Sequence, residues 1–386
     1  MNNKLIFWTD IPTPYRVSLY NKLKINKLNF EVWYSKSHVT SRYWRITNFK
    51  FKHNYILGRP VYFFFNKLSY HFFFSPFLIL KAIKLQKIDD IILALSWNDF
   101  NVLIIIILKK IGLLKARISF WSEANYLTFG ARNNYWLKTN YRIWIYNSID
   151  GFELSAGYMT KLTFKKWGIN KPFFIDFPNT IEEKNFFSNK KELELRLKNK
   201  KPIILIVARL IEKLKGIINF FQKLGLKRIK LAKFLIAGDG FDRIKLENYI
   251  KINKLEDNII LLGNISSSKQ LRFIYAKSNI FCLPSFSDPS PLAVIEALKM
   301  KLPLLVSNRC GNHFEAVRKG HNGFIFNPNS KKSVQMAFHE MIKVYKNKNL
   351  LKNFCEESEN IFNKKFALHR VISNFKNEYK RYNRSY

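Results

Sequence analysis

The chain is short of acidic residues and of cysteine. Of its 386 residues only 27 are Asp or Glu, against 66 Lys or Arg, so the formal net charge is +39. Such a surface attracts polyanions and anionic lipid head groups, although a basic, soluble protein without a dedicated partner would have the same composition. Its three cysteines, Cys282, Cys310 and Cys355, are too few and too scattered for a disulfide framework or a zinc site, and they suit a reducing compartment.

Long hydrophobic runs are also missing. The most apolar stretch, residues 91–108, is interrupted by polar side chains between Ser96 and Asn101, whereas a spanning helix needs about 20 apolar residues. The first residues lead from a short apolar strand to a proline turn, without the apolar core of a secretory signal. We therefore expect a cytoplasmic protein.

Several catalytic motifs are absent too. The sequence has no Walker loop, no G-x-S-x-G motif and no D-x-D pair, and its seven histidines are scattered. We expect neither a metal site nor a cofactor.

Short apolar runs alternate with longer amphipathic ones, a pattern typical of parallel, doubly wound α/β sheets. The chain is long enough for two such domains. Residues 180–202, rich in Lys, Glu and Asn, have no strand pattern and are interpreted as a linker carrying a short helix. Before this linker we expect strands at 5–8, 30–34, 55–57, 91–94, 117–121 and 173–177, and helices at 17–28, 75–86, 102–111, 134–147 and 158–167. After it we expect strands at 203–207, 233–237, 259–262, 280–284, 304–307 and 324–326, and helices at 217–224, 241–254, 268–276 and 291–300.

Two cations follow the first strand of the second half. Arg209 comes just after this strand, and Lys215 with Gly216 precedes the next helix. Ligands of parallel sheets bind at the carboxyl ends of strands, where a guanidinium and an ammonium group can hold a diphosphate. In a chain so rich in lysine, however, such a loop is more often a solvated turn.

An acidic pair, Asp288 and Glu296, lies on either side of Pro291. Asp or Ser can cap a helix here and Pro suits its first position, so the N–H groups of Leu292 and Ala293 would face an anion. Glu296 lies in an otherwise apolar helix, where its carboxylate could accept two ribose hydroxyls. Simple capping by Asp288 and a solvated Glu296 are the alternatives.

The glycines Gly238 and Gly240 form a strand-to-helix turn, and Gly311, Glu315 and Gly323 follow later; each is weak evidence alone. In order and spacing, residues 203–326 resemble the donor half of a family-4 (group 1) glycosyltransferase of the retaining GT-B type. The resemblance implies that Arg209 and Lys215 hold the donor diphosphate and that Asp288 approaches the donor sugar. Its further donor-binding residues would be Glu296 on the ribose, Leu292 and Ala293 on phosphate, and Gly238 and Gly240.

Two departures from the family pattern stand out. Asp288 replaces the usual Glu and is one methylene shorter. The spacing from Arg209 to Lys215 is one residue longer than usual, so Lys213 competes with Lys215, although Gly216 after Lys215 fits the pattern.

The first half resembles the family more faintly. Pro14, Tyr15 and Arg16 resemble the first-strand loop of bacterial polysaccharide enzymes, and this loop would line the acceptor side of the cleft. Arg16 could equally be a surface charge at a helix start. Glu123 ends a strand that points to the same cleft and could orient an acceptor hydroxyl, and Asn179 resembles the end of the first domain.

Together these features imply two Rossmann-like domains, residues 1–180 and 190–361, facing across a cleft. The apolar spacing of residues 362–386 suits a helix that packs back on the first domain. The implied activity is that of a retaining hexosyltransferase, which moves sugar from a nucleotide diphosphate-sugar to a saccharide or lipid-linked acceptor in cell-surface polysaccharide or lipopolysaccharide synthesis. The basic surface predicts peripheral binding to the inner face of the membrane, through residues 59–81 and 132–142. One alternative is another enzyme of this fold, a nucleotide-sugar epimerase or a phosphorylase, although the pyridoxal-phosphate lysine motif of a phosphorylase is missing. The other is a nucleic-acid-binding protein, which only the charge suggests, so we expect no nucleic-acid partner.

Overall fold

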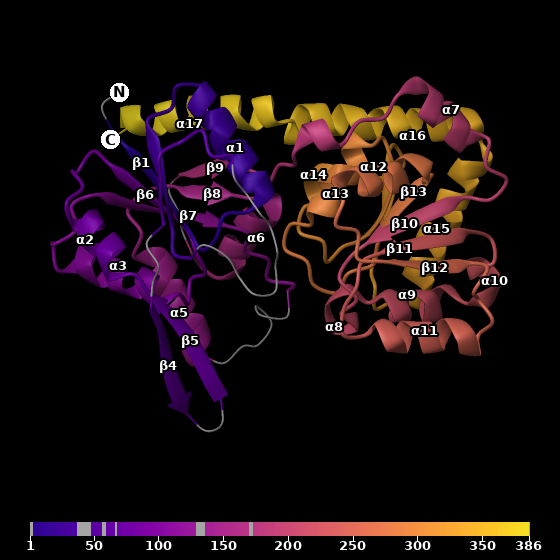
Figure 1. Cartoon of the computed structure of the whole chain (residues 1–386), viewed down its shortest axis with the longest axis horizontal. Helices are drawn as coiled ribbons and strands as arrows, with labels where there is room; N and C mark the ends of the chain where they lie inside the picture. Colours follow the sequence, from indigo (N-terminus) through magenta and orange to yellow (C-terminus); the bar gives the residue numbers. More distant parts are fainter. Residues whose placement is uncertain are drawn as a thin grey trace.

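The computed structural model describes residues 3–36, 48–55, 59–65, 68–128, 136–169 and 173–385. Two α/β domains lie next to each other (Figure 1), each built on a parallel sheet. This arrangement confirms the expected fold class. Within the described ranges, no helix combines the length and apolarity needed to cross a bilayer.

The first sheet has the strand order β3-β2-β1-β6-β7-β8-β9. Its strands are β1 (Leu5–Thr9), β2 (Phe30–Tyr34), β3 (His53–Tyr55), β6 (Asp90–Ala94), β7 (Arg117–Ser122), β8 (Glu153–Ser155) and β9 (Phe174–Asp176). The surrounding helices are α1 (Pro14–Ile25), α2 (Pro76–Ile83), α3 (Phe100–Lys110), α5 (Trp136–Asn147) and α6 (Tyr158–Lys166). All five residues of β1 are buried, because Leu5 and Phe7 belong to one core and Ile6 and Trp8 to another. Burial on both faces is typical of a parallel sheet between helical layers.

The second sheet has the order β12-β11-β10-β13-β14-β15. Its strands are β10 (Ile203–Val207), β11 (Lys233–Ala237), β12 (Ile259–Gly263), β13 (Ile280–Leu283), β14 (Leu304–Ser307) and β15 (Gly323–Phe326). Its helices are α8 (Glu212–Lys215), α9 (Ile217–Leu224), α10 (Leu226–Ile229), α11 (Arg243–Ile252), α12 (Ser268–Lys277), α13 (Leu292–Lys299), α14 (His313–Ala316), α15 (Lys331–Lys346) and α16 (Lys348–Ile361).

The segment expected to be a linker is largely part of the second domain. After a 3-10 turn, η1 (Glu183–Asn185), helix α7 (Lys190–Leu197) begins with a capping box between Asn189 and Glu192. Its Arg196 is buried and donates to the carbonyl oxygens of Ser278 and Met300 at 3.3 and 3.1 Å. These bonds fix the helix on the second domain.

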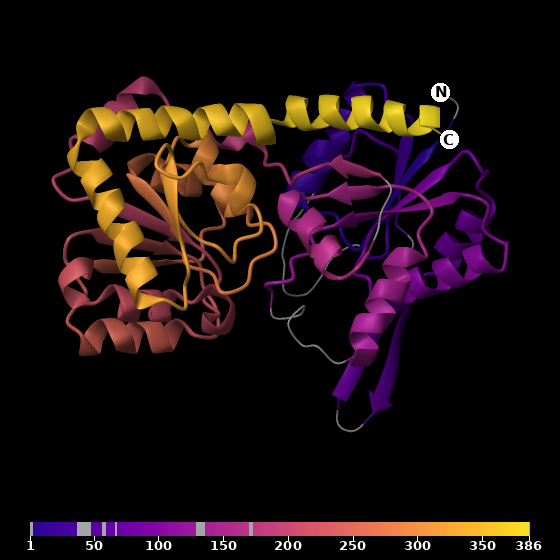
Figure 2. The same cartoon turned by 180° about the vertical axis from the view of Figure 1, so that it is seen from behind.

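The chain returns to the first domain at its end. After a π-helical turn, η2 (Phe362–Phe366), helix α17 (Leu368–Ser385) lies along the first domain (Figure 2). Phe375, Tyr379 and Tyr382 recur at helical spacing and belong to the same core as Phe7 and Phe152. The Tyr379 hydroxyl also donates to buried Asp90 at 2.6 Å.

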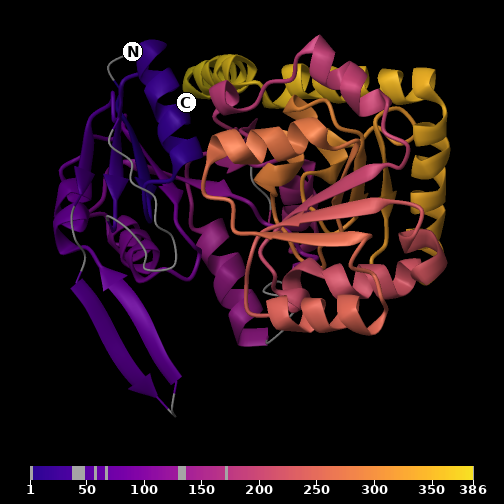
Figure 3. The same ribbon diagram turned by 45° about the vertical axis from the view of Figure 1, so that its right-hand side comes forward.

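A hairpin that the sequence did not predict stands away from both sheets. Its antiparallel strands β4 (Arg59–Phe65) and β5 (Leu68–Phe74) pair only with each other among the described strands (Figure 3).

The two domains also touch directly. Glu315, in α14 of the second domain, accepts a hydrogen bond of 2.6 Å from the backbone N–H of Tyr158, at the start of α6 in the first. The rings of Tyr158 and Phe314 meet edge to face at 5.0 Å.

Candidate functional site

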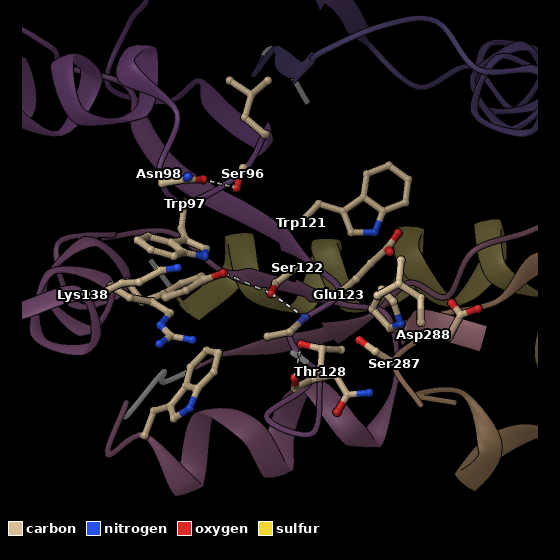
Figure 4. Close-up of a pocket in the computed structure, with 18 of the residues that line it drawn as sticks. Ser96, Trp97, Asn98, Trp121, Ser122, Glu123, Thr128, Lys138, Ser287 and Asp288 are labelled. Atoms are coloured by element: carbon tan, nitrogen blue, oxygen red, sulfur yellow. Dashed lines mark hydrogen bonds between the residues drawn. The ribbon is translucent and has the colours of Figure 1, made fainter. Parts of the chain in front are cut away.

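The site lies where the strand order of each sheet changes direction. In the second domain, the chain continues from β10 to β11 and β12 on one side of the sheet, and from β13 to β14 and β15 on the other. This reversal leaves a crevice between the ends of β10 and β13. The first domain has the same arrangement at β1 and β6. A cavity of about 560 Å³ lies between the domains (Figure 4). Its lining includes Ser96, Trp97, Asn98, Trp121, Ser122, Glu123, Lys138 and Arg142 from the first domain, and Arg209, Leu214, Lys215, Ser287, Asp288 and Pro289 from the second.

The structure brings the three expected catalytic residues together. Arg209, Lys215 and Asp288 all line this cavity, and the Lys215 ammonium group forms an ion pair with Asp288. We call the two cations that would hold the donor diphosphate the clamp. Lys213 is exposed and does not belong to the lining, so the geometry favours Lys215 over Lys213 as the partner of Arg209 in the clamp.

Gly216 holds this part of the site in place. It joins the short helix α8 to α9 in the left-handed conformation, with φ of 59°, and a Cβ atom there would lie 2.8 Å from the Phe286 ring. The carbonyl oxygen of Leu214 accepts bonds from the N–H groups of Phe286 and Ser287, at 2.8 and 3.1 Å. The loops that carry Lys215 and Asp288 are thus tied together by backbone bonds.

Helix α13 does not begin as expected. Pro291 is its N-cap residue, not its first residue, and makes no side-chain capping bond. Asp288 lies three residues before this cap, and its carboxylate pairs with Lys215. Leu292 and Ala293 still begin the helix, where N–H groups have no intrahelical partner, but neither residue lines the cavity.

Glu296 lies away from the cavity lining. Its Oε2 accepts a hydrogen bond of 2.8 Å from the Tyr275 hydroxyl. Burial raises the pKa of Glu296 to about 7, against the opposing effect of this bond. The carboxyl group is therefore held in place by Tyr275, and its contact with a ribose stays a prediction.

Gly238 and Gly240 also lie outside the lining. A Cβ atom on Gly238 would lie 1.9 Å from the carbonyl oxygen of Ala208, and one on Gly240 would lie 2.5 Å from that of Leu210. Both glycines therefore permit close backbone packing behind Arg209, which positions the loop.

On the first-domain side, Glu123 faces the cleft and Arg16 lies behind it. Glu123 accepts a bond of 2.8 Å from Asn179, and its Oε1 lies 4.0 Å from an Arg16 nitrogen. Arg16 also donates to Thr9 at 2.8 Å and stacks over Trp121 at 4.6 Å. Arg16 is thus a packed residue behind Glu123.

Pro14 and Tyr15 do not line the cleft. Pro14 lies at a different hollow, beside α1 and Lys184. Their contact with an acceptor therefore stays a prediction, while Arg16, in the first turn of α1, approaches Glu123.

An aromatic and basic wall, formed by Trp97, Lys138, Arg142, Tyr146 and Trp167, is not predicted from the sequence. The expectation that Arg142 belongs to a membrane-facing surface is wrong, because this residue is only 2% exposed. Its guanidinium carbon lies 4.2 Å from the Trp167 ring and 5.3 Å from the Trp97 ring. One signal was available: Arg142 precedes Ile145 and Tyr146 at helical spacing, on the buried face of α5.

Across the part of the chain that the structure describes, no three His, Cys, Asp or Glu side chains are grouped to hold a metal ion. Independence from metals and cofactors stays a prediction.

Comparison with known proteins assigns the second domain. Residues 188–360 match the family of glycosyl transferases group 1. The second domain is a group 1 glycosyltransferase domain. The chain is 30% identical, over 169 residues, to an uncharacterized glycosyltransferase of Haemophilus influenzae, covering 43% of this chain and 44% of that protein. The chain is 27% identical, over 171 residues, to the alpha-monoglucosyldiacylglycerol synthase of Acholeplasma laidlawii, covering 42% of this chain and 40% of that protein. The matched region thus spans less than half of these relatives.

The whole fold has solved counterparts. Sucrose-phosphate synthase from Thermosynechococcus elongatus superposes with a TM-score of 0.75 at 13% identity, covering all of both chains. Anabaena HepE, solved with UDP and glucose, gives 0.71 at 13% identity, covering 98% of this chain and 100% of that one. The first domain and the glycosyltransferase domain together therefore have the GT-B fold.

Proposed function

We propose that the protein is a hexosyltransferase that moves a sugar from a nucleoside diphosphate-sugar to a hydroxyl group of a saccharide or lipid-linked acceptor, with retention of anomeric configuration. The observation that carries the proposal is the meeting of Arg209, Lys215 and Asp288 with Glu123 in one cleft beside a group 1 glycosyltransferase domain. HepE, which has the same fold, is described with UDP and glucose bound.

In the proposed reaction, the bond between the anomeric carbon and the diphosphate oxygen breaks and negative charge develops on the diphosphate. Arg209 and Lys215 stabilise that charge, and the N-terminus of α13 adds its positive dipole end. Lys215 exchanges its bond to Asp288 for one to phosphate, which leaves the Asp288 carboxylate beside the donor sugar.

The acceptor oxygen forms the new bond to the anomeric carbon on the face that the diphosphate leaves. Its proton passes to the departing phosphate oxygen, so the reaction needs no covalent enzyme intermediate. Glu123, fixed by Asn179, orients the acceptor hydroxyl. Attack from the leaving-group side retains the anomeric configuration.

We further propose that the enzyme works at the inner face of an anionic membrane, in the assembly of a cell-surface saccharide. The net charge of +39 favours such a surface. On α2 of the first domain, Phe77 and Leu80 are 65% and 57% exposed and provide apolar contacts. The name of the Acholeplasma relative also describes synthesis of a glucosylated lipid.

The test is a thermal-shift screen of nucleoside diphosphates and nucleotide-sugars. A true donor raises the unfolding temperature by mass action, and Arg209→Ala, which lacks the guanidinium of the clamp, should lose this response while its own unfolding temperature stays close to that of the wild type. Transfer from the stabilising donor is then measured, and the anomeric configuration of the product is read by NMR. A panel in which nothing stabilises the wild type contradicts the proposed function, and an inverted product contradicts retention alone.

A further inference from the structure

We infer that the wall around Arg142 is a subsite for an anionic group on the acceptor, either a phosphate or a carboxylate. The inference rests on the proposed function, because it names the acceptor class of that same cleft.

Arg142 is a buried cation with unused hydrogen-bond donors. The residue is 2% exposed, yet its Nε and Nη2 atoms have no hydrogen-bond partner among the residues that the structure describes. Buried polar groups are nearly always bonded, and an unpaired donor on a charged group is costly to the folded state. The same side chain lines the cleft, but both atoms are closed to solvent, so a ligand there reaches them once the side chains that cover them move aside.

The two free donors lie on one edge of the guanidinium plane. Nε and Nη2 form the side-on pair with which arginine holds both oxygens of a carboxylate or phosphate. Stacking against Trp167 at 4.2 Å and Trp97 at 5.3 Å restrains that plane. The group is therefore oriented before any ligand arrives, which lowers the entropy cost of binding.

The charges of the cleft favour an anion at this wall. Among the described residues, four cations line the cavity, Lys138, Arg142, Arg209 and Lys215, against two carboxylates, Glu123 and Asp288. Asp288 is paired with Lys215, and Glu123 is bonded to Asn179 and near Arg16. Lys138 lies one helical turn before Arg142 on α5, so the two add their charges on one helix.

The experiment uses the full-length Arg209→Ala protein, in which the donor clamp is disabled. Calorimetry compares three probes: glucose 1-phosphate, glucuronic acid and the neutral methyl α-glucoside. We expect at least one of the two anions to bind at least tenfold more tightly than methyl α-glucoside, and the ratio of the two shows whether phosphate or carboxylate is preferred. Adding Arg142→Gln should abolish the preference. Adding Lys110→Gln, which removes an exposed cation 4.7 Å from Trp144 outside the cleft lining, should leave it unchanged.

Equal binding of neutral and anionic probes, or a preference that survives Arg142→Gln, overturns the subsite. If Arg142→Gln does not fold, Arg142→Lys serves instead, because it keeps the charge and loses the paired edge, and it should weaken anion binding at least fivefold. No change with Arg142→Lys again counts against the inference. These measurements need no nucleotide, so a protein that ignores every nucleotide-sugar but binds anions through Arg142 overturns the proposed function and leaves the anion site standing.

Discussion

Lys215 and Asp288 form an ion pair that joins the loop after β10 to the loop after β13. The pair lies at the crevice between the two strand ends, where a diphosphate would enter. Donor binding must therefore compete with a carboxylate already in contact with the lysine.

The clamp predicts different outcomes for two neighbouring lysines. Lys215→Ala should lower kcat/KM by about 100-fold, the usual effect of losing one group that stabilises developing charge. Lys213→Ala is the matched control, because it removes the same charge two residues away, from an exposed side chain. Steady-state kinetics with the donor identified by thermal shift decides between them. A larger loss for Lys213→Ala would reassign the clamp.

Glu296 predicts a pH dependence of stability. Its pKa is about 7 in the folded protein, against 4.5 for an ordinary glutamate. Between these values the folded state keeps a proton that the unfolded chain has lost. The contribution of protonated Glu296 to the free energy of unfolding is therefore complete below pH 4.5 and is lost as the pH rises through 7. Relative to Glu296→Gln, the free energy of unfolding of the wild type should fall by at most about 3 kcal/mol over this window. Urea unfolding of both proteins at several pH values measures the difference. Parallel curves would show that Glu296 titrates normally.

The contact between Glu315 and the N–H group of Tyr158 should hold the two domains together. Glu315→Ala removes a carboxylate from the start of α6, where negative charge contributes about 0.3–1 kcal/mol. We expect a larger radius of gyration in small-angle scattering without ligand. Glu315→Gln, which keeps a hydrogen-bond acceptor, should lie between the wild type and the alanine variant. Identical scattering curves for all three would mean that the contact does not set the domain arrangement.

Transfer should not depend on a divalent metal. In the proposed reaction, Arg209, Lys215 and the start of α13 neutralise the diphosphate, so a metal ion has no necessary role. Turnover in EDTA should match turnover with added magnesium. A loss of more than tenfold in EDTA, restored by magnesium, would require a metal in the donor complex.

The basic surface predicts reversible membrane binding. Each Lys or Arg near an anionic bilayer contributes about 1 kcal/mol, and the attraction is screened within about 10 Å at 0.1 M salt. The protein should sediment with anionic vesicles at low salt and be released at high salt. Equal binding to neutral vesicles, or no binding at low salt, would leave a basic enzyme without a membrane role.

The alternation of strands and helices could be predicted because buried parallel strands such as β1 and β10 are short, continuous apolar runs between longer amphipathic segments. Strand β8 was missed because three residues, Glu153–Ser155, are too few to show a period. Strands β4 and β5 were missed because apolar and aromatic residues fill the segment without the alternation that marks a half-buried strand.

The site could be predicted where its residues follow one another in a motif. Arg209, Lys215 and Asp288 belong to loops of one sheet, so order and spacing sufficed. Trp97, Arg142 and Trp167 come from three separate elements and meet only through tertiary packing. The prediction that Asp288 caps α13 was wrong because the helix begins only after Pro291, three residues further on, and the Asp288 carboxylate pairs with Lys215.

The place of α17 affects how this chain is made. Domains generally fold in the order of their synthesis, but Phe375, Tyr379 and Tyr382 complete the core of the first domain and are translated only after the second domain. The glycosyltransferase domain can therefore finish folding on the ribosome while the first domain still exposes part of its interior. A ribosome stalled before residue 362 would carry a folded donor half beside an unfinished partner, the state most open to chaperones and proteases.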